Sequence, residues 1–316
     1  METKKVKKLI SFVLPAYNEE KNIPQMFDDI KAVISSLENK YRYEIIFIND
    51  GSSDNSWAEI IATTQKDNGV KAINLSRNFG HQSALEAGIE NAMGDAVIML
   101  DCDGQHPVEI IEKLIEKWES GFKIVNTIRK DTEGVSRFKK ITAKFFYSLI
   151  NRFSDTKIIP GSADFRLIDR IVADTIKKLP EQNKFYRGLI NWVGFPTGYV
   201  EYNAKDRRFG KTSYTLKRMY KFAVDGLTGF SNFPLTIAKY IGLMIMAVGT
   251  LTLLSMLLLT LIGSSHFPIW VYLIVLVFLL NGLQFIVLWF IGNYIGRIFN
   301  QQRQRPNYII SEKINF

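Results

Sequence analysis

Two long stretches without a charged side chain, residues 240–263 and 266–296, constrain this chain more than any other feature. At the helical rise of 1.5 Å per residue, the first stretch extends over about 36 Å, which exceeds the roughly 30 Å of hydrocarbon in a bilayer. A buried core helix is the alternative, but core helices are usually shorter and seldom occur as an uninterrupted pair. We therefore expect two transmembrane helices in the last third of the chain.

The distribution of Lys and Arg predicts how these two helices are oriented. Basic residues precede the first stretch and follow the second, whereas the connecting residues 264–268 contain neither Lys nor Arg. By the positive-inside rule, both chain termini then lie in the cytoplasm, with a tight hairpin loop outside. Because no signal-peptide hydrophobic region precedes the first apolar run, we expect the large domain to stay in the cytoplasm.

The charge and the single cysteine narrow the class of protein further. A net charge of +9 is compatible with nucleic acid, a membrane surface or anionic substrates as partners. Since basic residues crowd the segments beside the apolar stretches, lipid headgroups and phosphates explain the charge more simply than nucleic acid does. Cys102 has no second cysteine to pair with, which excludes an internal disulfide and fits a reducing compartment.

The amino-terminal part of the chain alternates between short apolar runs and helical patterns, with no repeated hairpin signal. We predict strands over residues 9–14, 43–48, 70–75, 96–100 and 122–127, with helices between them. This alternation predicts an α/β domain whose mostly parallel sheet is covered by helices on both faces. The polar breaks follow the carboxyl ends of the strands, so one edge of the sheet collects Asp, Asn, Ser, Gly and Arg.

The strand over residues 96–100 leads into Asp101 and Asp103, which point the same way if the backbone stays extended. In open α/β sheets, ligands bind beyond the carboxyl ends of the strands. Two carboxylates at that edge can hold Mg²⁺ or Mn²⁺ against a diphosphate. An isolated Asp-x-Asp is more often a solvated turn, so the interpretation depends on the surrounding motifs. The histidines at 81, 106 and 266 are dispersed, and we expect no ligand set from them.

Past residue 134 the pattern changes. Residues 136–155 and 213–230 combine bulky apolar side chains at helical spacing with Lys and Arg. This combination favours basic helices lying in the membrane interface, and the alternative is helices that face an ordinary core. The tail after Arg297 is short and polar, and we expect it to be loosely ordered.

Four motifs occur in a fixed order along the chain: residues 15–19 (Pro-Ala-Tyr-Asn-Glu), residues 49–54 (Asn-Asp-Gly-Ser-Ser-Asp), residues 101–105 (Asp-Cys-Asp-Gly-Gln) and residues 207–212 (Arg-Arg-Phe-Gly-Lys-Thr). Together with the two apolar stretches, this order resembles glycosyltransferase family 2 with the GT-A fold. More narrowly, it resembles the bacterial polyprenyl-phosphate glycosyltransferases, the relatives of bactoprenol glucosyltransferase and dolichol-phosphate mannose synthase. The resemblance covers nearly the whole chain.

The resemblance implies a nucleotide-sugar site at the sheet edge. Asp50 would accept a hydrogen bond from the uracil imide, and Glu19 would reach the ribose. Asp101 and Asp103 would bind the metal, Mg²⁺ or Mn²⁺, that bridges the diphosphate. The remaining donor-side residues that the resemblance implies are Pro15, Ala16, Tyr17, Arg77, Asn78 and Gln105. Considered singly, Asp50-Gly51 could be a simple turn, and Asn18 or Ser53 a simple helix cap.

On the acceptor side, the segment 162–166 resembles the one that carries an acidic residue facing the sugar. Asp164 would therefore be the catalytic base or a group that orients the acceptor, and a helix cap is the alternative. Arg207, Arg208, Lys211 and Thr212 would bind the lipid phosphate, since guanidinium groups bind phosphate oxygens bidentately. The chain departs from the family pattern at Ser213, where a basic residue is usual.

The sequence thus predicts inverting transfer of a hexose, with glucose favoured, from a nucleoside diphosphate sugar, with UDP favoured, to undecaprenyl or another polyprenyl phosphate. The alternatives are another sugar (mannose, N-acetylhexosamine or aminoarabinose) or a membrane scaffold that binds nucleotide-sugar without turnover. A processive polysaccharide synthase is disfavoured, because its Gln-x-x-Arg-Trp motif and additional spans are missing from the sequence. Expected partners are the sugar donor, the lipid acceptor and the bilayer, with no nucleic acid, and relatives of this architecture can form tetramers.

The same interpretation divides the chain into four segments and places it in the bacterial inner membrane. Residues 1–134 form the nucleotide-sugar-binding GT-A core, and residues 135–234 form the acceptor-side segment with its amphipathic helices. Residues 235–296 form the two-span hairpin, and residues 297–316 form a cytoplasmic tail.

Overall fold

The computed structural model of the chain describes residues 7–129, 162–181, 184–203, 251, 255, 262, 268–303 and 305–316. The chain separates into two compact units, one with the sheet and its helices and the other with helix α10 (Ile269–Gln302). The predicted basic helices over 136–155 and 213–230 lie outside the described residues, as does nearly all of the first uncharged stretch. Over the described residues alone, no helix is both long and apolar enough to cross a membrane.

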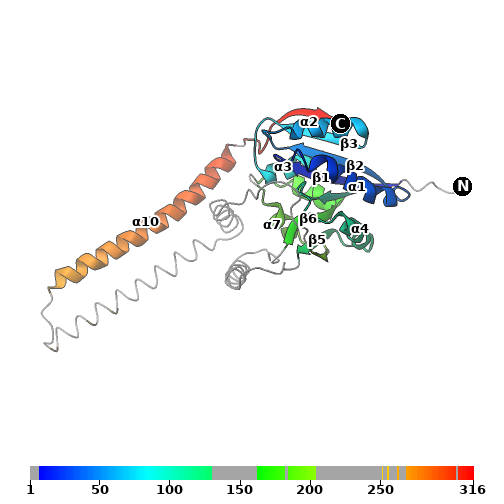
Figure 1. Cartoon of the computed structure of the whole chain (residues 1–316). Helices are drawn as coiled ribbons and strands as arrows, with labels where there is room; N and C mark the ends of the chain where they lie inside the picture. The colour runs from blue at the N-terminus through cyan, green and yellow to red at the C-terminus, as the bar shows by residue number, and fades with distance from the viewer. Residues whose placement is uncertain are drawn as a thin grey trace. The chain divides into compact units, whose positions relative to one another are not determined.

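The first part of the chain alternates strictly between strand and helix, as the sequence predicts (Figure 1). The elements are β1 (Lys8–Ala16), α1 (Ile23–Leu37), β2 (Tyr41–Asn49), α2 (Ser56–Lys66), β3 (Val70–Leu75), α3 (His81–Asn91), β4 (Ala96–Met99), the short 3₁₀ helix η1 (Val108–Ile110), α4 (Ile111–Glu119) and β5 (Ile124–Arg129). After the undescribed segment follow β6 (Ser162–Asp169), α6 (Arg170–Lys177), α7 (Tyr186–Trp192), β7 (Thr197–Tyr202) and, near the carboxyl terminus, β8 (Ile310–Ile314).

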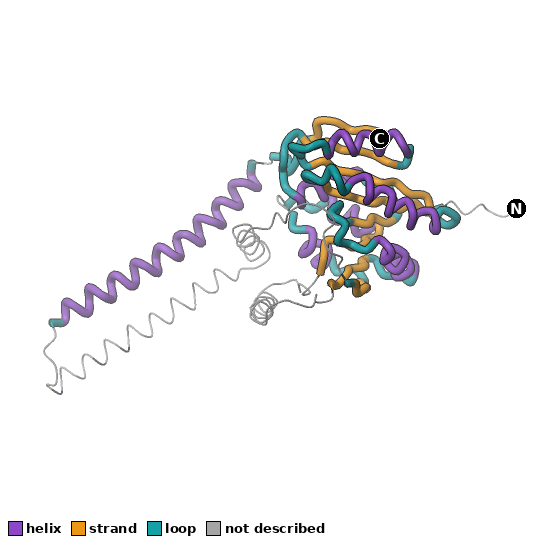
Figure 2. Tube along the Cα trace, in the orientation of Figure 1, coloured by secondary structure: helices purple, strands orange, loops and turns teal. Residues whose placement is uncertain are grey.

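The eight strands form one sheet in the order β7-β5-β6-β4-β1-β2-β3-β8. The pairs β4-β1, β1-β2, β2-β3 and β5-β7 are parallel, which confirms a mostly parallel α/β sheet. Figure 2 shows the strands side by side with helices packed against them. Strand β6 runs antiparallel between β4 and β5, so β4 and β5 are not neighbours. The sequence does not reveal β6 as a strand because Asp164 and Arg166 interrupt its apolar pattern.

The expectation of a loosely ordered tail is wrong. Strand β8 pairs antiparallel with β3 and completes one edge of the sheet. Tail side chains also contact α3, since Asn307 Nδ2 donates to Glu86 Oε2 at 2.8 Å and the Tyr308 hydroxyl donates to Glu90. The polar composition of the tail is explained by its position, because an edge strand buries only part of its surface.

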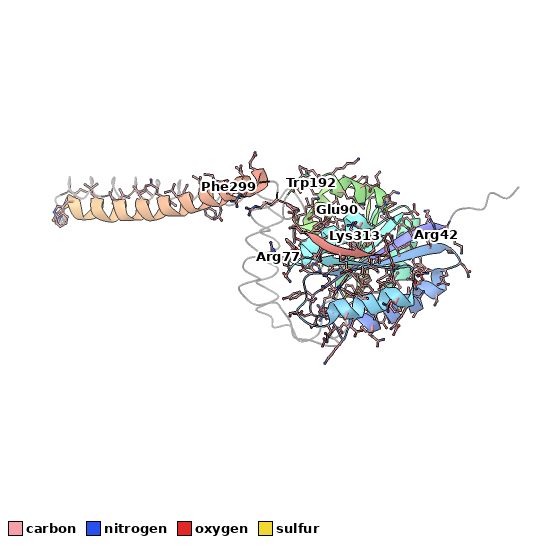
Figure 3. All side chains as sticks on the ribbon, turned by 90° about the horizontal axis from the view of Figure 1, so that it is seen from above. Arg42, Arg77, Glu90, Trp192, Phe299 and Lys313 are labelled. Atoms are coloured by element: carbon pink, nitrogen blue, oxygen red, sulfur yellow. The ribbon has the colours of Figure 1, made fainter. Side chains whose placement is uncertain are left out.

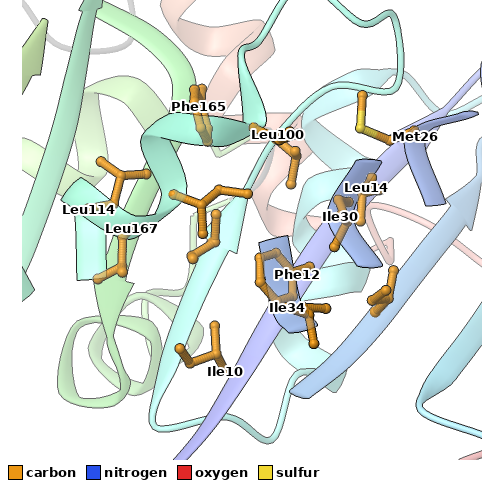
Figure 4. Close-up of a cluster of buried hydrophobic side chains, with 14 of the residues drawn as sticks. Ile10, Phe12, Leu14, Met26, Ile30, Ile34, Leu100, Leu114, Phe165 and Leu167 are labelled. Carbon is orange, nitrogen blue, oxygen red and sulfur yellow. The ribbon is translucent and has the colours of Figure 1, made fainter. Parts of the chain in front are cut away.

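Two apolar clusters, one on each face of the sheet, hold the helices in place. Ile10, Phe12 and Leu14 of β1 face α1 and its Ile30 and Ile34 (Figure 4). Val13 of β1 belongs to the other cluster, which contains residues of α3, α6 and α7. Because β1 is buried on both faces, it lies near the centre of the sheet, as its mostly apolar run predicts.

A network of buried polar side chains joins neighbouring strands near the amino-terminal ends of β1 and β2. The buried Glu44 carboxylate of β2 accepts hydrogen bonds from the Ser11 hydroxyl at 2.5 Å and the Met93 amide at 2.6 Å. Its second oxygen pairs with Lys71 Nζ of β3 at 2.7 Å. The Gly94 amide in turn donates to Ser11 Oγ at 2.8 Å. Burial alone would raise the pKa of Glu44, but these donors together lower it, so the carboxylate stays ionised.

Candidate active site

The predicted donor-side residues lie at the carboxyl ends of four parallel neighbours, β4, β1, β2 and β3. Pro15 and Ala16 end β1, and Asp50, Arg77 and Asp101 lie in the loops after β2, β3 and β4. Strand β1 continues through Pro15, which pairs in register with Ile48, while its pairing with β4 ends at Val13. The proline therefore needs no amide hydrogen on its β4 side.

Asp50 fastens the loop after β3 to the end of β2. Its Oδ1 accepts a hydrogen bond from the Phe79 amide at 2.7 Å, and its Oδ2 accepts one from the Gly80 amide at 3.0 Å. Burial raises the pKa of the Asp50 carboxyl above its ordinary value, although the two amides act in the opposite direction. Both carboxylate oxygens are thus engaged within the protein, and the predicted contact with uracil would use their remaining lone pairs.

Gly51 permits the same two loops to touch. Its φ of +61° lies in the left-handed region, and a Cβ there would stand 2.4 Å from both the Arg77 carbonyl carbon and the Asn78 nitrogen. No other residue fits at this position without moving the backbone of the donor-side loop. Asp50-Gly51 is therefore a turn, as one interpretation of the sequence holds, and it also holds together two predicted donor-binding loops.

The loop after β1 is tied to the loop after β2 by side chain–backbone hydrogen bonds. Asn18 Oδ1 accepts from the Ser53 amide at 2.8 Å, and the Asn18 amide donates to Ser52 Oγ at 3.0 Å. The alternative role of Asn18 as a helix cap is wrong, because Asn22 occupies that position of α1. Tyr17 is exposed, and the Glu19 amide donates to Ser56 Oγ at 2.8 Å. Their roles toward the base and the ribose stay predictions.

Arg77 and Asn78 lie exposed after β3, at the carboxyl end of the strands. The Arg77 guanidinium stacks on the Phe79 ring at 4.1 Å and donates to the Asn78 carbonyl at 3.1 Å. In Figure 3, Arg77 and Arg42 mark opposite ends of the sheet. The guanidinium is thus held beside the edge where the predicted donor site lies, and its contact with the donor stays a prediction.

Asp101 lies between two histidines. His81, the first residue of α3, places Nε2 2.7 Å from Asp101 Oδ1, and His106 places Nε2 3.3 Å from Asp101 Oδ2. Desolvation opposes protonation of His81, yet the charge of Asp101 and their hydrogen bond raise the pKa of His81 to about 9. The two histidines in turn hold the pKa of Asp101 well below its usual range, against the effect of burial.

The antiparallel strand β6 brings Asp164 to the same edge. Met99 of β4 is in register with Arg166 of β6, and Asp164 lies two residues further toward the edge on the same face. Asp164 Oδ2 lies 4.0 Å from His81 Nδ1. Asp164 is not a helix cap, since Asp169 caps α6 with a hydrogen bond from the Ile171 amide. Because β6 runs antiparallel to β4, the start of β6 places Asp164 at the edge formed by the carboxyl ends of the parallel strands.

Arg187 of α7 binds the Asp164 carboxylate bidentately, with Nε 2.7 Å from Oδ1 and a terminal nitrogen 2.8 Å from Oδ2. Buried Arg166 lies 3.8 Å from the same Oδ1. The Asp164 side chain is only 8% exposed. Burial opposes ionisation, but Arg187, helped by His81 and Arg166, lowers the pKa of Asp164. The carboxyl is therefore an ionised, fixed group.

The donor atoms at this edge fit a divalent cation that is shared with a diphosphate. Asp101 is 33% exposed, and its two oxygens keep free lone pairs beside their contacts with histidine. Asp103 follows two residues later, where its Oδ1 accepts the Gln105 amide at 3.0 Å. Among the described residues no set of three His, Cys, Asp or Glu side chains could hold a metal. Mg²⁺ needs no such set, because one or two carboxylates, water and substrate phosphates complete its shell.

The structure adds residues that the sequence interpretation missed. His81 and His106 were set aside as dispersed, yet both contact Asp101. Arg187 carries no recognisable motif, and only the fold places it against Asp164. His106 directly follows the motif at residues 101–105, and this adjacency in the sequence could have indicated its contact with Asp101. The predicted phosphate-binding residues Arg207, Arg208, Lys211 and Thr212 lie outside the described residues.

Comparisons with known proteins identify the family. The family model described as "Glycosyl transferase family 2" matches residues 11–177. The glycosyltransferase YkcC of Bacillus subtilis is 42% identical over 96% of this chain and 93% of its own length. The bactoprenol glucosyl transferase of Shigella phage SfV is 40% identical over 96% of this chain and 98% of its own. A bactoprenol glucosyl transferase homologue of an Escherichia coli prophage is 40% identical over 95% of this chain and 98% of its own length.

Among solved structures, glucosyl-3-phosphoglycerate synthase of Mycobacterium tuberculosis in complex with Mg²⁺ and UDP gives a TM-score of 0.48 at 18% identity. The match covers 69% of this chain and 76% of that chain. The family match and the relatives confirm the resemblance drawn from the four sequence motifs. The chain belongs to glycosyl transferase family 2, and it is a glycosyltransferase.

Proposed function

We propose that this glycosyltransferase transfers a hexose, with glucose favoured, from a nucleoside diphosphate sugar to undecaprenyl or another polyprenyl phosphate. Relatives named bactoprenol glucosyl transferase support the carrier and the sugar, because they are about 40% identical over almost the whole chain. UDP as the donor nucleotide and inversion at the anomeric carbon are parts of the same proposal. The observation that carries it is the convergence of Asp101, Asp103 and Asp164 at one edge of the sheet.

Asp101 and Asp103 are the residues that would hold Mg²⁺ or Mn²⁺ against the donor diphosphate. A bound cation would supply Lewis-acid stabilisation of the charge that builds on the leaving nucleoside diphosphate. His81 and His106 contact the Asp101 carboxylate through its two different oxygens. The stacked Arg77 offers a further positive charge at the same edge.

We assign Asp164 a positioning role in preference to proton removal. An acceptor phosphate monoester has its second pKa near 6 and is already largely dianionic at neutral pH. The Asp164 carboxylate, whose pKa is lowered by Arg187, would be a weak base. The pair can instead orient the acceptor and the sugar so that a phosphate oxygen attacks the anomeric carbon as the bond to the diphosphate breaks. This single displacement needs no second nucleophilic carboxylate.

We propose further that the enzyme works at the cytoplasmic face of the bacterial inner membrane. The support comes from the sequence, where two uncharged stretches are flanked by Lys and Arg and joined by residues without either. A polyprenol tail would stay in the bilayer while Arg207, Arg208, Lys211 and Thr212 receive its phosphate. This arrangement explains why a transferase would carry a positively charged segment between its catalytic domain and its membrane anchor.

Incubation of the full-length protein in detergent with undecaprenyl phosphate, Mn²⁺ or Mg²⁺ and a panel of nucleotide sugars tests the proposal. We expect one lipid-linked product, formed from UDP-glucose, that disappears in Asp103→Ala. A product formed only from another donor would keep the reaction class and correct the sugar. Nucleotide-sugar binding without transfer to any lipid would contradict the proposal and favour the scaffold.

A further inference from the structure

His106 connects Asp101, the proposed metal-binding carboxylate, to Tyr202 of strand β7. His106 contacts Asp101 Oδ2 through Nε2, as described above, and its Nδ1 lies 3.3 Å from the hydroxyl of Tyr202. Tyr202 is the final residue of β7, and the predicted phosphate-binding residues 207–212 follow it closely in the sequence. His106 therefore connects the loop after β4 to a strand three places away in the sheet.

Packing fixes the orientation of the His106 ring. The ring centroid lies 5.1 Å from that of Phe165 and 5.9 Å from that of Tyr202, and the Phe165 and Tyr202 rings meet edge to face at 6.2 Å. The His106 side chain is 8% exposed. With neighbours on its faces and a polar partner at each nitrogen, the imidazole has little freedom to rotate.

The direction of the hydrogen bonds follows from the chemistry of the end groups. An ionised Asp101 carboxylate can only accept, so Nε2 of His106 carries a hydrogen and donates it. The Tyr202 hydroxyl, 3.3 Å from Nδ1, donates to that nitrogen in the tautomer whose hydrogen is on Nε2. The hydroxyl thus selects the tautomer that points an N–H group at Asp101, as carboxylates and carbonyls do for metal-binding histidines.

We propose that His106 and Tyr202 are positioning residues that set the orientation of Asp101 for the divalent cation. The inference rests on the proposed function, since it assumes that Asp101 and Asp103 bind the metal. Tyr202 ends β7, and the residues predicted to bind the acceptor phosphate follow it in the sequence. Outer contacts of this kind typically change metal affinity or activity about 10- to 100-fold when they are removed.

Titration of the full-length protein with Mn²⁺ in the presence of UDP, followed by the electron paramagnetic resonance signal of free Mn²⁺, tests the inference without requiring turnover. We expect His106→Phe, which keeps a ring but loses both nitrogens, to weaken Mn²⁺ binding about 10- to 100-fold. His106→Gln, whose amide N–H can reach the position of Nε2, should restore affinity to within a few fold of the wild type. Tyr202→Phe removes one hydroxyl, and we expect a loss of about 2- to 10-fold.

Tyr199→Phe is the matched control, because Tyr199 lies on the same strand and is 40% exposed. We expect this variant to bind Mn²⁺ as the wild type does. Unchanged affinity in both folded Tyr202→Phe and folded His106→Phe would overturn the inference, as would equal losses in His106→Gln and His106→Phe. If His106→Phe does not fold, Tyr202→Phe decides the question, since it keeps every ring contact.

Asp103→Ala separates this inference from the proposed function. If the wild type binds Mn²⁺ and Asp103→Ala does not, the proposed metal site is supported. The His106 and Tyr202 variants then test only the inference about positioning. If the wild type and Asp103→Ala bind Mn²⁺ equally, the metal site proposed for this edge is wrong. The inference then fails together with it.

Discussion

The two ends of the sheet each hold a buried, ionised carboxylate, but they surround it differently. At the amino-terminal end, Glu44 is enclosed by Ser11 and Lys71 on neighbouring strands and by the Met93 amide. At the carboxyl-terminal end, Asp164 and Asp101 are held by side chains from α7, α3 and the loop after β4. The first arrangement uses side chains of two neighbouring strands and one amide between α3 and β4, whereas the second depends on loops and helices meeting at the edge of the sheet.

Glu44 and Asp101 also differ in what each carboxylate can still bind. Both oxygens of Glu44 contact donors within the protein, and its side chain is 4% exposed. Asp101, with a third of its side chain exposed, keeps access to solvent beside its two histidines. We propose that Glu44 stabilises the fold and that the carboxylates at the carboxyl-terminal edge serve the reaction, and four predictions test this proposal.

The largest expected effect is on transfer in Asp164→Asn. The amide keeps the shape of the side chain but loses the charge that binds Arg187, so the acceptor is misplaced, and we expect a fall of about 100-fold in kcat/KM. The pH dependence of kcat should keep the wild-type shape, because Asp164 does not remove a proton. Loss of the acidic limb of that profile would make Asp164 a base. Asp169→Asn, at the other end of β6, is the control and should keep its activity.

At the amino-terminal end, Glu44→Gln should reduce the free energy of unfolding by about 3 kcal/mol. If the glutamine oxygen accepts from Ser11 and Met93, its amide group faces the Lys71 ammonium, which places donor against donor. Denaturant unfolding measures the loss, and transfer per folded molecule should stay at the wild-type level. If Glu44→Gln had normal stability but impaired transfer, Glu44 would serve the reaction and not the stability of the fold.

Gly51→Ala tests the contact between the donor-side loops. The left-handed φ and the close approach to the Arg77 backbone should lower stability by about 1–3 kcal/mol and raise the KM for the sugar donor. Gly121→Ala is the matched control, since Gly121 also has a positive φ but no atom within 4 Å of its added Cβ. It should lose stability without any change in donor KM. Equal donor KM values in the two variants would contradict the proposed position of the donor site.

The smallest expected effect is the contribution of Glu44 to acid unfolding. Because the folded-state pKa of Glu44 is lowered, its stabilisation is fully present above the ordinary glutamate pKa of about 4.3 and is lost as the pH falls through the folded value. The difference in unfolding free energy between wild type and Glu44→Gln should therefore shrink as the pH falls below about 4.3. A difference that stays constant down to pH 3 would show that the ion pair does not stabilise the fold.

The sequence was sufficient for the parallel part of the fold, because apolar strands buried on both faces and polar breaks after them leave few alternatives. It was insufficient for β6, where Asp164 and Arg166 occupy buried positions and form ion pairs that the local pattern does not reveal. The tail strand β8 gave little apolar signal because its three central residues, Ser311, Glu312 and Lys313, are polar and exposed at the edge of the sheet.

The candidate site likewise contains residues that the sequence indicates and residues that only the fold brings to the site. Asp101 and Asp103 could be read from their position after a buried strand, since neighbouring residues in sequence carry that signal. Arg187 and His81 could not, because their contacts join elements that are distant in the chain and depend on the reversed strand and on α3 and α7. Pairings of this kind follow from topology and leave no local pattern in the sequence.

Side-by-side measurement of transfer and unfolding in Asp103→Asn and Glu44→Gln tests the division between the two ends of the sheet most directly. Asp103→Asn should lower transfer to undecaprenyl phosphate by up to about 100-fold, because a proposed metal-binding charge is lost, while its unfolding free energy stays close to that of the wild type. Glu44→Gln should do the opposite. Both variants losing stability and neither losing transfer per folded molecule would contradict the assignment of the reaction to the carboxyl-terminal edge.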